Sequence, residues 1–159
     1  MKQLFIATSP GQTRQLAKRT AQRINKEYSV YTKNRTQAAI IVLKGILGSG
    51  KTEFTKGLAQ YFEIKENVLS PTFILMRKFK INKKTSAFQN LWHLDCYRLL
   101  PHPDKPLQDL NLGDILNDPQ NIVVIEWGEY LKILKQYRTL VISFSIKQER
   151  QRKIIIDFL

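Results

Sequence analysis

Residues 38–62 read AAIIVLKGILGSGKTEFTKGLAQYF, and this stretch decides the fold. It opens with six consecutive apolar residues, 38–43, rich in β-branched side chains, a run typical of a strand buried on both faces. A glycine-rich turn follows. Apolar side chains then return at helical spacing, at Phe54, Leu58, Ala59 and Phe62. The segment therefore predicts a strand, a turn and a helix in direct succession, which indicates an α/β protein.

The turn matches the phosphate-loop pattern G-x-x-x-x-G-K-[ST]. It comprises Gly45, Ile46, Leu47, Gly48, Ser49, Gly50, Lys51 and Thr52. Glycines let the backbone approach a ligand closely, so that successive N–H groups bind phosphate oxygens, and the following helix adds its positive N-terminal end. In such loops the lysine contacts the β- and γ-phosphates and the Thr hydroxyl coordinates Mg²⁺. We therefore expect a nucleotide with Mg²⁺. ATP is favoured, because residues 82–85 lack the aspartate of the N-K-x-D pattern that GTPases use on guanine.

Two carboxylates follow predicted strands, where a nucleotide-hydrolysing enzyme needs them. Asp95 ends the stretch 91–94, and Glu126 ends 122–125. A carboxylate at either place can bind metal-bound water or orient the attacking water. The alternative for each is a structural acid that caps a helix or forms a salt bridge. We expect Thr52, Asp95 and Glu126 at the metal and Lys51, Asp95 and Glu126 in catalysis.

The rest of the chain predicts one domain over residues 1–159, a three-layer α/β domain of the P-loop NTPase type with a mixed parallel and antiparallel sheet. A first helix is expected around Leu16, Ala17, Ala21 and Ile24. Further strands are expected at 73–81, 91–97 and 122–125, short helices within 107–116, broken near Gly113, and at 129–134, and a terminal hairpin from 140–146 and 153–158.

Charge and cysteine content indicate the class of partner and the cellular compartment of the protein. Lys and Arg number 26 against 13 Asp and Glu, a net charge of +13 that favours polyanionic partners. Seven of the acids lie within 95–129, so an acidic region is framed by basic ones. The single cysteine excludes a disulfide framework and fits a reducing compartment, so we expect a cytoplasmic protein. The longest apolar run, of six residues, is far short of the roughly 20 needed to span a membrane, and no membrane association is expected.

Four short blocks occur in the order and spacing of one known family. They are residues 47–52, 70–73, 93–99 and 125–127, and with the first helix they cover about 8–131. On these blocks the sequence resembles the TsaE (YjeE) family, small P-loop ATPases that support bacterial threonylcarbamoyladenosine modification of tRNA. The family usually has aspartate at the position of Ile46, alanine at Ser49, threonine at Glu53 and proline at Gly128.

The resemblance implies an ATPase whose turnover is coupled to the TsaB–TsaD complex, which transfers the threonylcarbamoyl group to adenosine 37 of tRNA. The family does not perform that transfer, and tRNA is reached through the complex. Thr72 then belongs to a switch-like segment that senses the γ-phosphate or the metal, and Trp127 flanks the nucleotide. The nucleotide-binding residues implied are Gly48, Ser49, Gly50, Lys51, Thr52, Glu53, Thr72 and Trp127. From the residues alone, Trp127 fits a core position equally well.

Two other functions remain open at this point. A small-molecule or nucleotide kinase has a similar phosphate loop, although no arginine-rich lid with acceptor-binding spacing is evident. A basic RNA-binding adaptor that uses ATP only as an assembly switch is the second. It would bind tRNA without partners, and that affinity would fall steeply with salt.

Overall fold

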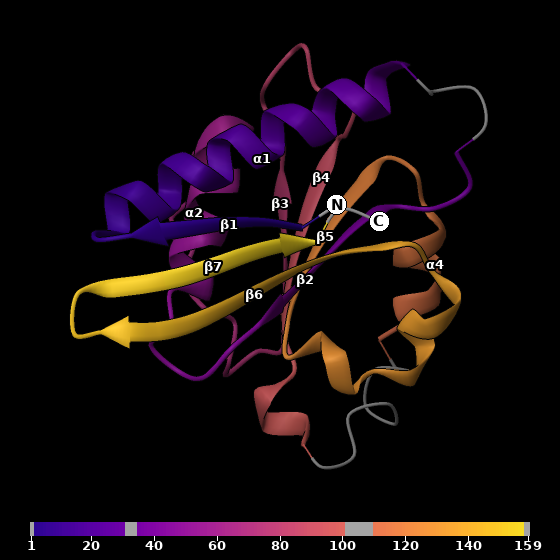
Figure 1. The fold of residues 1–159 in the computed structure, drawn as a ribbon. Helices are drawn as coiled ribbons and strands as arrows, with labels where there is room; N and C mark the ends of the chain where they lie inside the picture. The colour runs from indigo at the N-terminus through magenta and orange to yellow at the C-terminus, as the bar shows by residue number, and fades with distance from the viewer. Residues whose placement is uncertain (1, 31–34, 101–109, 158–159) are drawn as a thin grey trace.

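The computed structural model describes residues 2–30, 35–100 and 110–157. These residues form a seven-stranded sheet in the order β1-β7-β6-β2-β5-β4-β3 (Figure 1). The strands are β1 (Lys2–Ala7), β2 (Ala39–Lys44), β3 (Met76–Lys80), β4 (Asn90–Asp95), β5 (Asn121–Glu126), β6 (Thr139–Gln148) and β7 (Gln151–Asp157). The central strands β6, β2, β5 and β4 run parallel, and β1, β7 and β3 pair antiparallel with their neighbours. The mixed sheet expected from the sequence is confirmed.

Helices cover both faces of this sheet. The long helix α1 (Pro10–Val30) and α2 (Lys51–Tyr61) pack together on one face (Figure 1). The other face carries α4 (Leu112–Asn117) and the 3₁₀ helices η3 (Gly128–Tyr130) and η4 (Lys132–Gln136), whose apolar side chains share one cluster with those of the central strands. A third 3₁₀ helix, η2 (Tyr97–Leu99), follows β4. The three-layer α/β arrangement is therefore confirmed.

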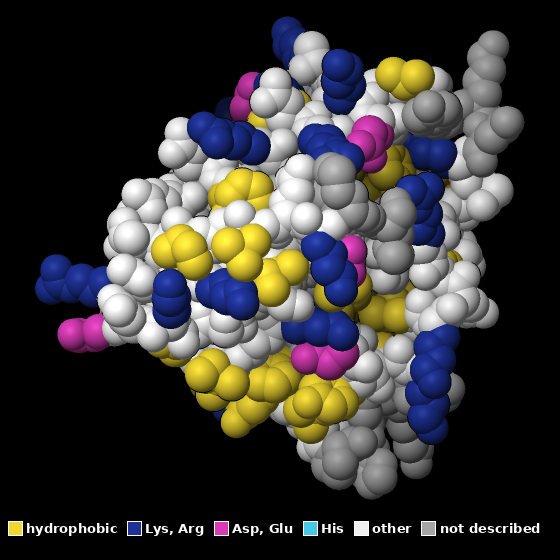
Figure 2. Space-filling model, viewed as in Figure 1, with side chains coloured by type: hydrophobic (Ala, Val, Ile, Leu, Met, Phe, Trp, Pro, Cys, Tyr) yellow, Lys and Arg dark blue, Asp and Glu magenta, His cyan; other side chains and the backbone are white. Residues whose placement is uncertain are grey.

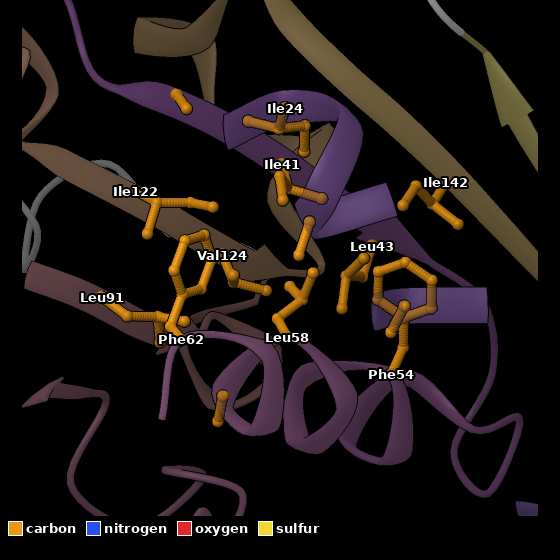
Figure 3. Packing of buried hydrophobic residues seen from close by; sticks show 14 of the residues in the cluster. Ile24, Ile41, Leu43, Phe54, Leu58, Phe62, Leu91, Ile122, Val124 and Ile142 are labelled. Atoms are coloured by element: carbon orange, nitrogen blue, oxygen red, sulfur yellow. The ribbon is translucent and has the colours of Figure 1, made fainter. Parts of the chain in front are cut away.

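The apolar run 38–43 does not alternate with polar residues because both of its faces are buried. Ile41 and Leu43 face the α1/α2 cluster, and Ile40 and Val42 face the opposite one. Figure 3 shows Ile41 and Leu43 against Leu58 and neighbouring α2 side chains. Full burial of such a side chain stabilises the fold by about 1.5–3 kcal/mol relative to exposure. This packing fixes β2 and α2, and with them the turn that joins them.

Two predicted strands are shorter than expected. The strand predicted at 73–81 is confirmed only as Met76–Lys80, because residues 71–75 form a turn in which the Leu75 amide donates to the Pro71 carbonyl at 2.7 Å. Leu75 has φ 64°, a left-handed conformation that ends pairing. The strand predicted at 91–97 ends at Asp95, and η2 begins two residues later.

The sequence-based description missed one strand and misplaced some helix boundaries. The missed strand is β1, whose short alternating pattern Lys2–Ala7 pairs with β7. Gly113 lies inside α4 and does not break it, while the predicted residues 107–109 lie outside the described part. The helix expected at 129–134 consists of the 3₁₀ helices η3 and η4. The terminal hairpin is confirmed, apart from position 158, which also lies outside the described residues.

Within the described ranges, no helix combines the length and apolarity that crossing a bilayer requires.

Candidate phosphate-binding site

The turn between β2 and α2 has the backbone that a phosphate cradle requires. Three of its glycines have positive φ: 144° at Gly45, 72° at Gly48 and 106° at Gly50. A Cβ on Gly45 would lie 2.5 Å from the Phe144 carbonyl oxygen, so only glycine fits between the loop and β6. The loop leads into the N-terminus of α2, where unpaired backbone N–H groups and the helix dipole favour an anion.

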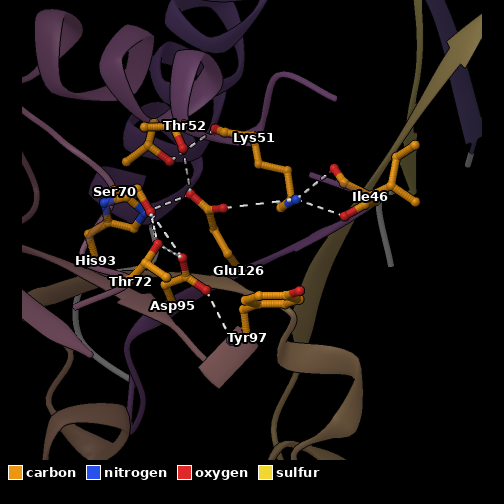
Figure 4. Close-up of polar contacts among 11 residues, drawn as sticks. Ile46, Lys51, Thr52, Ser70, Thr72, His93, Asp95, Tyr97 and Glu126 are labelled. Carbon is orange, nitrogen blue, oxygen red and sulfur yellow. Dashed lines mark hydrogen bonds and ion pairs between the residues drawn. The ribbon is translucent and has the colours of Figure 1, made fainter. Parts of the chain in front are cut away.

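Lys51 lies buried at the centre of this loop. Its ammonium donates to the Gly45 carbonyl at 2.7 Å and to the Ile46 carbonyl at 3.0 Å (Figure 4). It also lies 4.0 Å from a Glu126 carboxylate oxygen and 4.8 Å from the Trp127 ring centroid. Burial lowers the pKa of Lys51, against the opposing effect of Glu126, Asp95 and Glu129. The hydrogen bonds of the ammonium therefore go to two neutral carbonyls, which a charged phosphate oxygen would outcompete, while Glu126 lies at the outer limit of an ion pair.

Glu126 connects three parts of the site. One of its oxygens, Oε1, accepts a hydrogen bond from the Thr52 hydroxyl at 3.1 Å and lies 3.0 Å from His93 Nε2 (Figure 4). The other, Oε2, faces Lys51. Glu126 and His93 are 4% and 0% exposed, so this network is shielded from solvent and its contacts are correspondingly strong.

Asp95 anchors the segment that precedes β3. Its Oδ2 accepts hydrogen bonds from the Thr72 hydroxyl at 2.5 Å and the Ser70 hydroxyl at 2.9 Å, while Oδ1 accepts one from the Tyr97 amide at 3.0 Å (Figure 4). Asp95 also sits directly opposite Glu126 in the parallel register of β4 and β5. The two predicted carboxylates therefore meet at one edge of the sheet, with Thr72 beside them.

The other residues predicted to bind the nucleotide lie in the loop itself or beside Lys51. Gly48, Ser49 and Gly50 form the loop, and the buried Ser49 hydroxyl has no hydrogen-bond partner among the described residues. Trp127, in a left-handed conformation at φ 62°, places its ring beside Lys51 and near Tyr97, at 5.3 Å between ring centroids.

Glu53 is directed toward α1. It pairs with Arg14, and with Lys56 at 2.6 Å. Burial acts to raise the pKa of Glu53, but the hydrogen bonds from Lys56 and Arg14 together outweigh it, so that pKa is lowered. Glu53 therefore joins α2 to α1 through Arg14, and its carboxylate is neutralised by Arg14 and Lys56.

The structure brings to this site three residues to which the sequence analysis assigned no role there. These are Ser70 on Asp95, His93 on Glu126, and Arg152, whose guanidinium donates to the Gly48 carbonyl at 3.3 Å. For His93 a signal was present: it lies two residues before Asp95 on one strand, so both side chains point to the same face. The contact of Arg152 depends on the β6–β7 hairpin folding over the loop, which no local pattern encodes.

The side-chain oxygens of Thr52, Asp95 and Glu126 fit a magnesium ion bound with a nucleotide. Among the described residues no group of three or more His, Cys, Asp or Glu forms a self-sufficient metal cage. Mg²⁺ prefers hard oxygen ligands and commonly uses only one or two carboxylates together with substrate phosphates and water. Thr52, Asp95 and Glu126 supply a hydroxyl and two carboxylates at the start of α2, which matches that requirement.

Comparison with known proteins agrees with the resemblance. The family model described as "Threonylcarbamoyl adenosine biosynthesis protein TsaE" matches residues 7–154. A relative from Rickettsia felis, named "tRNA threonylcarbamoyladenosine biosynthesis protein TsaE", is 30% identical over 94% of this chain and 76% of its own length. A Nostoc protein of the same name is 33% identical over 75% of this chain and 71% of its own.

Two further comparisons differ in how much of the chains they cover. A relative of that name from Mycobacterium bovis is 37% identical over 58% of this chain, and the match spans only 55% of its length. The crystal structure of YdiB from Bacillus subtilis, 23% identical, superimposes with a TM-score of 0.68 over 98% of this chain and 84% of that one, which shows a shared fold. Because the family model matches residues 7–154, nearly the whole chain, the chain belongs to the TsaE family.

Proposed function

We propose that this chain binds and hydrolyses ATP with Mg²⁺ as an accessory protein of tRNA threonylcarbamoyladenosine biosynthesis, acting with a TsaB–TsaD-like complex. The observation that carries the proposal is the convergence of Lys51, Thr52, Asp95 and Glu126 at the loop before α2. The family model and the sheet both extend over nearly the whole chain, which supports one ATPase domain over residues 1–159.

The roles follow from the contacts. Backbone N–H groups of the loop bind the phosphates, and Lys51 leaves the carbonyls of Gly45 and Ile46 for phosphate oxygens of higher charge. Thr52, whose hydroxyl donates to Glu126, would hold a magnesium ion together with Asp95 and Glu126. Magnesium bound with the nucleotide neutralises charge that develops on the phosphoryl group.

Glu126 then orients the attacking water, and His93 positions Glu126. With the proton on Nε2, His93 donates to Glu126 Oε1 and fixes the carboxylate from the side away from Lys51. Because His93 is fully buried and does not face the loop lysine, its effect on turnover is indirect. We regard His93 as a positioning residue.

The surface beside the loop supports a protein partner. Large apolar side chains at Ile46, Leu47, Phe73 and Ile74 are between 58% and 81% exposed. Phe73 and Ile74 follow Thr72, which is bonded to Asp95, so a partner that covers them would restrain the segment holding that carboxylate. Arg98 stacks on the Phe73 ring at 4.1 Å and adds charge to this apolar surface. A partner that contacts Phe73 and Ile74 would act on Asp95 through Thr72, which offers a route for coupling turnover to the complex.

The test is ATP hydrolysis measured alone and then with the purified TsaB–TsaD-like partners. We expect slow turnover alone, stimulation by the partners, and loss of that stimulation in Lys51→Ala and Glu126→Gln. The matched control is Lys56→Ala, which removes a lysine of the same helix that pairs with Glu53 away from the loop. Transfer of labelled phosphate to a small acceptor in place of water would instead establish a kinase.

A further inference from the structure

A second concave site lies at the opposite edge of the sheet from the phosphate loop. It is a cavity of about 670 Å³ between the C-terminal half of α1 and the starts of β2 and β6. Since β2 runs from this cavity to the loop, and six strand residues span roughly 20 Å, the two sites are separate. The volume is within the range of about 300–1,000 Å³ that ligand sites occupy.

Basic side chains dominate the polar lining of this cavity. Arg23, Arg35 and Arg138 contribute to it, against one acid, Glu27. Arg23 Nε donates to Glu27 at 2.9 Å, so that carboxylate is already compensated by one guanidinium within α1. Three guanidinium groups against one carboxylate give the described lining of the cavity an excess of positive charge.

Arg35, Arg138 and Tyr28 all line this cavity. The Arg35 guanidinium lies 4.7 Å from the Tyr28 ring centroid and 5.6 Å from that of Phe88. Burial raises the pKa of Tyr28, with the charges of Arg35 and Arg138 acting against it, so the phenol is neutral at pH 7. The neutral phenol and the two guanidinium groups together form a donor set suited to a phosphate.

The wall of the cavity is fixed, and one of its donors lacks an acceptor. Gln37 donates to the Arg138 carbonyl at 3.0 Å and accepts from the Arg138 amide at 3.4 Å, which ties β6 to the chain entering β2. Arg35 Nη1 contacts the Pro119 carbonyl at 3.5 Å, whereas its Nε is buried without a hydrogen-bond partner among the described residues. Arg35 as a whole is only partly buried and lines the cavity, so it can meet an anion there.

Further bases continue the positive surface away from the cavity. Asn25 of α1 donates to the Thr85 carbonyl at 3.1 Å and accepts from the Ala87 amide at 2.8 Å, which holds the chain that follows Lys83 and Lys84 against α1. The exposed residues Lys18, Arg19 and Lys26 lie along α1 itself. Lys and Arg side chains are spread over the face that carries α1 (Figure 2). A free nucleotide needs only the cavity, whereas a polyanion uses the whole surface.

We propose that this cavity binds a phosphate group of an RNA strand, with Arg35, Arg138 and Tyr28 as its ligands and the bases along α1 guiding the neighbouring phosphates. The site is independent of the ATP site. The net charge of +13 supplies the long-range attraction, and the cavity supplies a fixed point on the strand.

The test is binding of a short, fluorescently labelled single-stranded RNA by the full chain, measured by anisotropy over a range of salt concentrations with saturating Mg·ATP present. Arg138→Gln and Arg35→Gln are each expected to weaken binding about 5- to 10-fold and to lower the log–log salt slope by about 0.7, the value for one contact to a single strand. Arg150→Gln removes the same charge at the exposed β6–β7 turn, far from the cavity along β6, and is expected to change binding less than 2-fold.

Three outcomes would overturn the proposal. Wild-type affinity in Arg138→Gln, in a variant whose melting temperature is unchanged, overturns the proposal. Equal weakening by Arg150→Gln shows attraction by overall charge, and competition by adenosine monophosphate at an equal phosphate concentration shows a free-nucleotide site; both also overturn it. ATP turnover of Arg138→Gln is measured on the same preparation, and a failure of the ATPase proposal leaves the RNA result unaffected.

Discussion

Substituting two glycines of the same loop with alanine tests whether the loop is the rigid cradle described above. At Gly48, φ is 72° and no atom lies within 4 Å of an added Cβ, so Gly48→Ala costs only the left-handed conformation, about 1–2 kcal/mol. At Gly45, φ is 144°, a strain of about 1–3 kcal/mol. The added Cβ also overlaps the Phe144 carbonyl oxygen at 2.5 Å, and overpacking of this kind costs about 1–3 kcal/mol more.

Gly45→Ala is therefore expected to destabilise the protein by about 4 kcal/mol, some 2–3 kcal/mol more than Gly48→Ala. For a chain of this size 1 kcal/mol corresponds to roughly 2–4 °C in melting temperature, so the two variants are expected to differ by roughly 4–12 °C. Thermal unfolding followed by circular dichroism measures the difference.

Affinity for Mg·ATP supplies the functional half of this comparison. In Gly45→Ala the loop must shift away from β6, and we expect at least an approximately tenfold loss of affinity. Equal melting temperatures for the two variants would refute the reasoning, because the loop would then not be held against Phe144 as the structure describes.

The other predictions concern helix packing, pH and catalysis. Gly57→Ala is expected to destabilise by about 1–3 kcal/mol, because its Cβ would lie 2.4 Å from the Arg14 carbonyl oxygen of α1, whereas Gly113→Ala, in open space within α4, is expected to stabilise by about 0.5–1 kcal/mol. Denaturant unfolding of both variants would contradict this if the signs were equal. The lowered pKa of Glu53 means that its pairing stabilises the fold above its unfolded pKa of about 4.3 and that this contribution is lost as pH falls below that value. The difference in unfolding free energy between wild type and Glu53→Gln should accordingly shrink from pH 6 to pH 3, and a constant difference would disprove it. His93→Leu is expected to lower kcat about 10-fold with little change in the KM for ATP, and His93→Gln, which keeps an N–H donor, to restore part of it; equal rates in the two variants would assign His93 a structural role only.

The parts of the fold predicted correctly are those whose residues satisfy local and tertiary requirements together. The run 38–43 has both faces buried, so its lack of alternation identified the central strand β2. The loop was recognisable because its glycines stand where the backbone has positive φ, at fixed spacing from Lys51 and Thr52. Asp95 and Glu126 could be paired in advance, since the carboxyl ends of neighbouring parallel strands meet at the same edge.

The parts that were missed depend on contacts between distant segments. β1 is a short edge strand whose outer residues are exposed, and it exists because β7 offers a hydrogen-bonding edge. The segment 71–75 is apolar enough to read as a strand, but the turn that begins at Pro71 gives it a non-extended backbone, and it meets the end of β4 only through the bonds of Thr72 and Leu75 to Asp95. Glu53 was expected among the nucleotide-binding residues of the helix that follows the loop, and its pairing with Arg14 depends on the approach of α1, which no local pattern encodes.

The central claim is that the loop around Lys51 binds the phosphates of ATP, and calorimetric titration of Mg·ATP tests it most directly. Wild type and Lys56→Ala are expected to bind one nucleotide with equal affinity, and Lys51→Ala at least about tenfold more weakly, since a charged hydrogen bond to phosphate is worth about 1.5–3 kcal/mol. Absence of binding in the wild type, or unchanged affinity in Lys51→Ala, would contradict the account.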